Sequence, residues 1–187
     1  MKKLMMIAAM VLMSTGAFAQ EMFIKPMVGG TLASFRGSDV EHAKMKVGLV
    51  AGAEFGFMFN EKMGATAGLL YTMQGVKYKG DDYNENLDYL NIPVLFNYYI
   101  IPGLAVKAGV QPGILVRAKY DDLDIKDEYK SFDVAIPIGV SYEFSDFVID
   151  ARYNLGMTKI YDISVYGYTP KIYNSVIQLT IGYKIPL

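Results

Sequence analysis

The sequence of 187 residues has no cysteine, no tryptophan and a single histidine. The absence of cysteine excludes a disulfide framework and any metal site built on thiolates. Basic residues are not in excess, since 18 lysines and arginines stand against 19 acids, so charge does not favour nucleic acid as a partner. After residue 19, no run approaches the roughly 18 continuous apolar residues that predict a transmembrane helix.

The first 19 residues have the pattern of a cleaved export signal. Two lysines precede an apolar stretch at 4–13, and an Ala-Phe-Ala cleavage site ends at Ala19. The apolar stretch is too short to anchor the chain across a bilayer. We therefore expect a signal peptide over 1–19 and one mature domain over 20–187. Loss of the two lysines leaves 16 basic residues against 19 acids in that domain.

The mature chain alternates between apolar and polar residues with a period of two, which is typical of β-strands. Between Leu104 and Lys119, one face is apolar and the other carries Lys107, Gln111 and glycines. If the apolar faces point to lipid and the small and charged faces point inward, the pattern predicts a transmembrane β-barrel. The alternative is a secreted soluble barrel of the lipocalin type, in which the apolar faces point inward.

Eight segments carry this alternation, and their connections alternate in length. We expect strands over 22–34, 45–58, 64–75, 88–100, 104–118, 131–144, 147–158 and 173–185. Short turns alternate with polar loops at 35–44, 76–87, 119–130 and 159–172. In outer-membrane barrels the short turns are periplasmic and the long loops are external. The sequence therefore predicts an all-β fold, an eight-stranded antiparallel up-and-down transmembrane β-barrel in the outer membrane.

Charged residues recur on the predicted inner face. The interior of an eight-stranded barrel is just wide enough to be filled by side chains, and a buried charge is costly unless it is paired. We therefore predict ion pairs that close the lumen, and a charge-lined solute path is the alternative. The candidates are Lys25, Glu54, Lys107, Arg117, Asp133, Glu143, Asp150, Arg152 and Lys184.

Three prolines lie in the middle of neighbouring predicted strands, at Pro93, Pro112 and Pro137. Proline cannot donate a hydrogen bond to a sheet. Their similar distance from the turns predicts a local bulged seam. Isolated kinks without a function are the alternative.

Three stretches resemble a known family. They read LLYTMQG at 69–75, YLNIPVL at 89–95 and DARYNLGMT at 150–158. They resemble the small outer-membrane β-barrel proteins of Gram-negative bacteria described as PorT-like or as porin family. The resemblance covers the whole mature chain and implies an eight-stranded barrel, with little implied about activity. The chain departs from the family by ending in Leu187 in place of an aromatic residue, and by Gly68 where relatives carry an inward acid.

Few residues suggest chemistry. His42 has Ser34, Ser38 and Asp39 nearby in sequence, which is the one hint of a lipid hydrolase, but the spacing does not supply a base with an orienting group. The acids at 121–128 lack the glycine and the spacing of a calcium loop. We therefore predict no catalytic residue, no metal site and no cofactor.

The loop at 159–172 is apolar for an exposed segment. Either its flanking strands extend as a hairpin, or it forms a surface patch for a partner. The candidate partner-binding residues are Tyr161, Val165, Tyr166 and Tyr168.

We expect a structural or surface-recognition role through four external loops. The expected partners are outer-membrane lipid, the barrel-assembly machinery during insertion, and a surface or secretion partner whose identity stays open. A small-solute channel or a secretion-system accessory barrel is the alternative, and an outer-membrane lipid hydrolase is a third.

Overall fold

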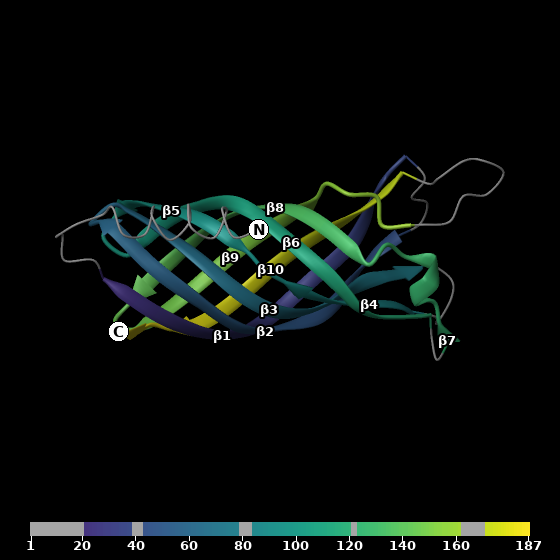
Figure 1. The fold of residues 1–187 in the computed structure, drawn as a ribbon, viewed down its shortest axis with the longest axis horizontal. Coiled ribbons are helices and arrows are strands. Elements are labelled where there is room, and N and C mark those ends of the chain that lie inside the picture. Colours follow the sequence, from purple (N-terminus) through teal and green to yellow (C-terminus); the bar gives the residue numbers. More distant parts are fainter. Residues whose placement is uncertain (1–20, 39–42, 79–83, 121–122, 162–170) are drawn as a thin grey trace, which may run out of the picture.

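The chain forms a closed antiparallel β-barrel. The computed structural model describes residues 21–38, 43–78, 84–120, 123–161 and 171–187. Eight strands are hydrogen-bonded in a ring, because β10 pairs with β1 as well as with β9. The strands are inclined to the long axis of the barrel (Figure 1). In the described residues, no helix has both the length and the apolar character to span a membrane.

The predicted strand order is confirmed, and most strands extend further toward the loops than the alternation predicted. The barrel strands are β1 (Met22–Gly37), β2 (Ala43–Asn60), β3 (Met63–Tyr78), β4 (Asn84–Asn91) continued by β5 (Val94–Ile101), β6 (Leu104–Tyr120), β8 (Phe132–Phe144), β9 (Phe147–Gly156) and β10 (Ile172–Tyr183). The smaller elements are β7 (Leu123–Asp124), the 3₁₀ helix η1 (Lys126–Glu128) and β11 (Ile185–Pro186).

The two ends of the barrel differ. Short connections join β2 to β3, β5 to β6 and β8 to β9 at one end, which we call the turn end. The C-terminus lies at this end, on the left in Figure 1, while β7 and η1 lie at the other, the loop end. Antiparallel pairing of sequential strands explains this arrangement, because each hairpin returns the chain to the opposite end.

The outer wall of the barrel is apolar. Ile138 is 56% exposed and Ile177 42% exposed, so the faces that a soluble barrel would bury point outward. Aromatic rings gather near the turn end, where Phe147 lies between Phe144 and Tyr183 with ring centroids 5.7 and 5.2 Å apart. An apolar outer wall with a band of aromatic rings is typical of a barrel surface in contact with lipid and not with water. The soluble lipocalin-type alternative is therefore wrong.

The predicted bulged seam at the mid-strand prolines is wrong. Pro93 separates β4 from β5, yet pairs on both sides keep one register with β6, namely Asn91 with Gly113 and Val94 with Val110. The carbonyl of Pro93 still accepts a hydrogen bond from the Gly68 amide at 2.9 Å. Proline removes one donor from the ladder without inserting a residue, so the strand is interrupted but not shifted.

Candidate functional site

Side chains fill the lumen, and three successive layers of them can be followed along strand β6. From the turn end toward the loop end, its inward residues include Lys107, Gln111 and Leu115, all of them buried. Lys107 belongs to a layer of charges, Gln111 to a layer of carboxamides and Leu115 to an apolar cluster. The interior therefore changes in character along its length.

The first layer, which we call the ionic layer, is a network of buried charges. Its members are Lys25 from β1, Glu54 from β2, Lys107 from β6, and Asp150 and Arg152 from β9. Glu54 lies 2.9 Å from the Lys25 ammonium and 2.5 Å from the Arg152 guanidinium. Asp150 lies 2.6 Å from Lys107 and 2.5 Å from Arg152. Each carboxylate thus bridges two cations across the lumen.

Water is nearly excluded from this layer. The five side chains are each 5% exposed or less. Buried charges of this kind are tolerated only when they are paired and hydrogen-bonded, which the network provides. Three cations and two anions leave one excess positive charge, held between opposite walls of the barrel. The ionic layer closes the lumen at this level.

The second layer, the amide chamber, is uncharged apart from one acid. It is a small cavity of about 10 Å³. Its polar lining consists of Gln74, Asn91, Gln111, Asp133, Asn154 and Asn174. Each of these side chains is more than nine-tenths buried. Strands β3, β4, β6, β8, β9 and β10 each contribute one of them.

The third layer is an apolar cluster at the loop end, which we call the apolar cap. Its buried members are Phe35, Val76, Leu87, Tyr89, Leu115, Ala118, Tyr129 and Ile160. Tyr129 and Ile160 come from the two loops on either side of the β8–β9 hairpin, and the Lys130 amide donates to the Ile160 carbonyl at 2.7 Å. The base of these loops therefore folds inward over the mouth and seals it.

A buried hydrogen bond holds Tyr129 in the apolar cap. Its hydroxyl donates to the carboxylate of Glu85, and it lies 2.8 Å from the hydroxyl of Tyr161. The Tyr129 and Tyr161 rings lie with their centroids 4.6 Å apart. Burial, followed by the adjacent Glu85 carboxylate, raises the pKa of the Tyr129 phenol far above its ordinary value. Tyr129 therefore remains a neutral donor throughout the physiological pH range.

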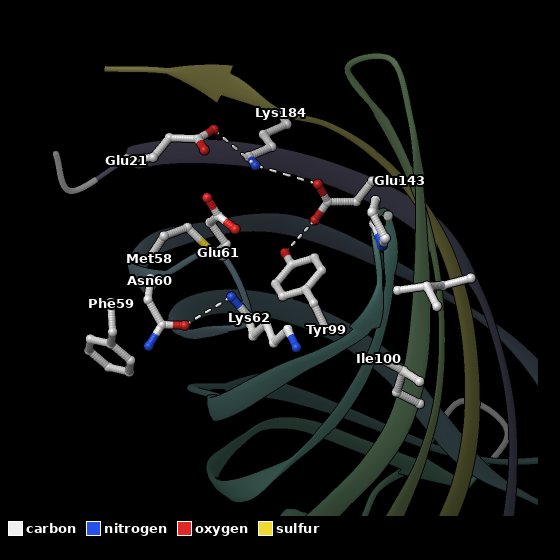
Figure 2. Close-up of a pocket in the computed structure, with 13 residues that line it drawn as sticks. Glu21, Met58, Phe59, Asn60, Glu61, Lys62, Tyr99, Ile100, Glu143 and Lys184 are labelled. Atoms are coloured by element: carbon white, nitrogen blue, oxygen red, sulfur yellow. Dashed lines mark hydrogen bonds and ion pairs between the residues drawn. The ribbon is translucent and has the colours of Figure 1, made fainter.

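The turn end opens into a vestibule of about 920 Å³ (Figure 2). A chain of polar contacts crosses it: the Lys184 ammonium lies 3.0 Å from Glu21 and 3.4 Å from Glu143, and the Tyr99 hydroxyl donates to Glu143 at 2.5 Å. Apolar side chains such as Phe59 and Ile100 form part of the lining. The vestibule is thus accessible from outside, and it lies on the turn-end side of the ionic layer.

The sequence and the fold both match known membrane barrels. Residues 18–162, more than half of the chain, match the family described as outer membrane protein beta-barrel domain. The chain belongs to this outer-membrane β-barrel family. No curated protein matches it as a relative. Its place is accordingly the outer membrane, and its apolar wall faces lipid.

Solved structures of outer-membrane barrels share this fold. Neisserial surface protein A, from Neisseria, superposes with a TM-score of 0.61 at 14% identity, over 87% of this chain and 97% of that one. The attachment invasion locus protein Ail of Yersinia pestis, in complex with the heparin analogue sucrose octasulfate, gives a TM-score of 0.55 at 18% identity, over 90% and 100% of the two chains. At these identities the likeness shows the fold alone.

In this outer-membrane barrel, five of the nine predicted inward charges form the ionic layer. Glu143 and Lys184 meet in the vestibule. Asp133 points inward, but its partners are neutral: the side chains of Thr158 and Asn174 and the amide of Val134.

The prediction that Arg117 faces inward is wrong, because its side chain is 51% exposed and does not enter the lumen. The cause is a bulge in β6. Asp88 pairs with Arg117 while Tyr89 pairs with Leu115, so Val116 is an extra residue that reverses the faces beyond it. Arg117 lies 3.6 Å from Asp88 on the outside.

The candidates for chemistry and partner binding are only partly described. Tyr161 is half-buried against Tyr129 at the edge of the apolar cap, whereas Val165, Tyr166 and Tyr168 lie outside the described residues. His42 also lies outside them, and the Ser34 hydroxyl donates to the Phe35 carbonyl at 3.4 Å. Within the described ranges, His, Cys, Asp and Glu form no group of three or more that would hold a metal.

The amide chamber and the apolar cap were missed by sequence reasoning. Part of the signal for the chamber was present, because its five carboxamides occupy inward positions of five strands. The cap had no such signal, since Tyr129 and Ile160 lie in loops where alternation gives no direction.

Proposed function

We propose that this barrel is a closed, non-conducting protein of the outer membrane whose external loops serve recognition. The ionic layer carries the proposal, because five charges, linked by ion pairs of 2.5–3.9 Å, span the lumen with almost no exposure to water. A solute path would need a continuous hydrated route. The apolar cap supports the same conclusion, since it excludes water at the loop end.

A conductance measurement tests the closed lumen. We expect no steady current when the purified barrel is inserted into planar lipid bilayers. A matched variant in which Lys25, Glu54 and Arg152 are all replaced by alanine removes the centre of the ionic layer, and it reports whether an opened lumen would be detected. Steady conductance steps from the unmodified protein would overturn the proposal.

The vestibule is the observation that favours the alternative, a small-solute channel. Its volume of about 920 Å³ would admit a small molecule from the turn end. The ionic layer lies between the vestibule and the amide chamber, so passage would require these ion pairs to break. Uptake of labelled solutes into vesicles carrying the barrel, above that of empty vesicles, would support the channel against the closed barrel.

The recognition role rests on the loops and requires a separate test. We expect cells that display the barrel to adhere to a surface partner, and deletion of residues 163–169 to reduce that adhesion while heat-dependent gel mobility shows a folded barrel. Lys62→Ala, at the turn end, is the matched control and should adhere as the unmodified protein does. Equal adhesion by cells without the barrel would leave it with a structural role only.

A further inference from the structure

The amide chamber has the composition of an ion site. Five carboxamides and one carboxylate surround a cavity of about 10 Å³, close to the space that one water-sized particle requires. The chamber lies between the ionic layer and the apolar cap, away from bulk solvent. A barrel that needed only to fill this space would do so at less cost with apolar side chains.

Four of the five carboxamide nitrogens of the chamber donate to neighbouring side chains. The Gln74 and Asn91 amide nitrogens both donate to the Thr72 hydroxyl, at 2.9 and 2.6 Å. The Asn154 nitrogen donates to Gln178 at 3.4 Å, and the Asn174 nitrogen donates to Asp133 at 2.8 Å. Thr72 and Gln178 do not line the cavity, so three of these four nitrogens are drawn away from it.

Oxygen atoms remain without partners in the chamber. The side-chain oxygens of Gln111 and Asn154 are buried and have no hydrogen-bond partner in the described structure, although both residues line the cavity. Each of these side chains is 4% exposed. A buried acceptor without a partner costs about 1–3 kcal/mol, which calls for an occupant that interacts with oxygen.

Asp133 adds a negative charge to the same cavity. Its described partners are all neutral, so no ion pair satisfies it. The excess positive charge of the ionic layer opposes a divalent ion in the neighbouring chamber more strongly than a monovalent one. Hard cations are bound by oxygen ligands of this kind.

We propose that the amide chamber binds one dehydrated monovalent cation of the size of Na⁺, held by the Asp133 carboxylate and the side-chain oxygens of Gln111 and Asn154. A water molecule is the competing occupant. Water would donate to two of these oxygens, but its own lone pairs would find fewer donors, because the Gln74, Asn91 and Asn154 nitrogens donate to groups outside the cavity. The ion would enter during folding and would then be enclosed by the layers on either side.

Stability in different salts tests the site. The barrel is folded into detergent micelles in NaCl or in N-methylglucamine chloride at equal ionic strength, and its unfolding is followed by tyrosine fluorescence. Above the dissociation constant, each tenfold increase in Na⁺ should multiply the folding equilibrium constant about tenfold, because the unfolded chain has no assembled site. An equal response to the two salts would overturn the proposal.

Variants assign the effect to the chamber. Asp133→Asn and Gln111→Met should each weaken the Na⁺ dependence, and either variant suffices if the other fails to fold. Glu61→Gln, an exposed acid of the β2–β3 turn, is the matched control and should keep the full dependence. A full Na⁺ response in either chamber variant would contradict the assignment.

A high-resolution crystal structure of the barrel folded in NaCl gives an independent readout. A density peak whose distances to Asp133, Gln111 and Asn154 oxygens are all clearly shorter than hydrogen bonds would support the proposal. A peak at hydrogen-bond distances from these oxygens, as for a water molecule, would overturn it.

Discussion

Replacing Glu54 with glutamine should destabilise the barrel strongly. The substitution keeps the size and shape of the side chain but removes the charge that bridges Lys25 at 2.9 Å and Arg152 at 2.5 Å. Asp150 would then face three buried cations alone. Lys25 would lose its closest counter-charge, and Arg152 would lose one of its two, in a site with almost no access to water.

The expected size of the effect follows from the geometry. With an effective dielectric constant near 20, each contact of Glu54 has a gross attraction of about 6 kcal/mol. Most of this attraction offsets the cost of removing the charges from water, and the mutual repulsion of Lys25 and Arg152 reduces it further. Breaking a buried pair by removing one partner typically costs about 3–5 kcal/mol, which is the loss we expect for Glu54→Gln.

Urea-dependent folding into lipid vesicles measures this free energy, with tyrosine fluorescence and heat-dependent gel mobility as readouts. Glu143→Gln is the matched control, because Glu143 also contacts two groups, Lys184 and Tyr99, but lies in the open vestibule. The Glu143 side chain is 17% exposed against 0% for Glu54, so Glu143→Gln should cost less free energy of unfolding than Glu54→Gln. The double variant Lys25→Met/Glu54→Gln should lose less than the single variants added together. A cost below about 1 kcal/mol for Glu54→Gln would refute a dry ionic layer.

Three further predictions concern the cap, the wall and a strained glycine. Tyr129→Phe should lower the free energy of unfolding by about 1.5–3 kcal/mol, because it removes a hydrogen bond to the buried Glu85 carboxylate. Because folding raises the pKa of Tyr129, its phenol contributes fully to the free energy of unfolding below its ordinary pKa of 10.0, and this contribution is lost as the pH rises further. The free energy of unfolding of Tyr129→Phe, measured by urea titration, should therefore decline less at alkaline pH than that of the unmodified protein. Ile138→Lys places a charge on the middle of the lipid-facing wall and should cost about 2–4 kcal/mol in vesicle folding, whereas an unchanged midpoint would argue against contact with lipid. Gly75 has a φ of +121°, and a Cβ there would lie 2.0 Å from the Glu85 carbonyl oxygen, so Gly75→Ala should cost at least about 1 kcal/mol in the same assay.

The strands and their faces were predictable because a period of two is a local property. Lys25 and Glu54 both fell on the inward face by counting along their own strands, and they are direct neighbours in the β1–β2 ladder. The same counting placed Arg117 on the wrong face, because one extra residue, Val116, exchanges the inward and outward positions of β6 beyond it. Counting cannot locate a bulge, since the alternation on each side of it looks regular.

The layers of the lumen were not predictable from one strand at a time. Which inward residues share a level depends on the stagger between neighbouring strands, which is a property of the closed barrel. Counting placed Gln111 and Asn154 on the inward face but gave no sign that they meet at one level. The apolar cap depends on Tyr129 and Ile160, whose direction is set by contacts between loops and not by alternation.

The ionic layer has a consequence for biogenesis. Lys25 and Glu54 come from the first hairpin, whereas Asp150 and Arg152 come from the last one. Lys25 can pair with Glu54, and Arg152 with Asp150, within their own hairpins, but the contact of Arg152 with Glu54 forms only when the first strand joins the last. Ring closure thereby completes the network, and a nascent chain that stops short of its final hairpin keeps buried charges with fewer partners, which is unfavourable in a bilayer.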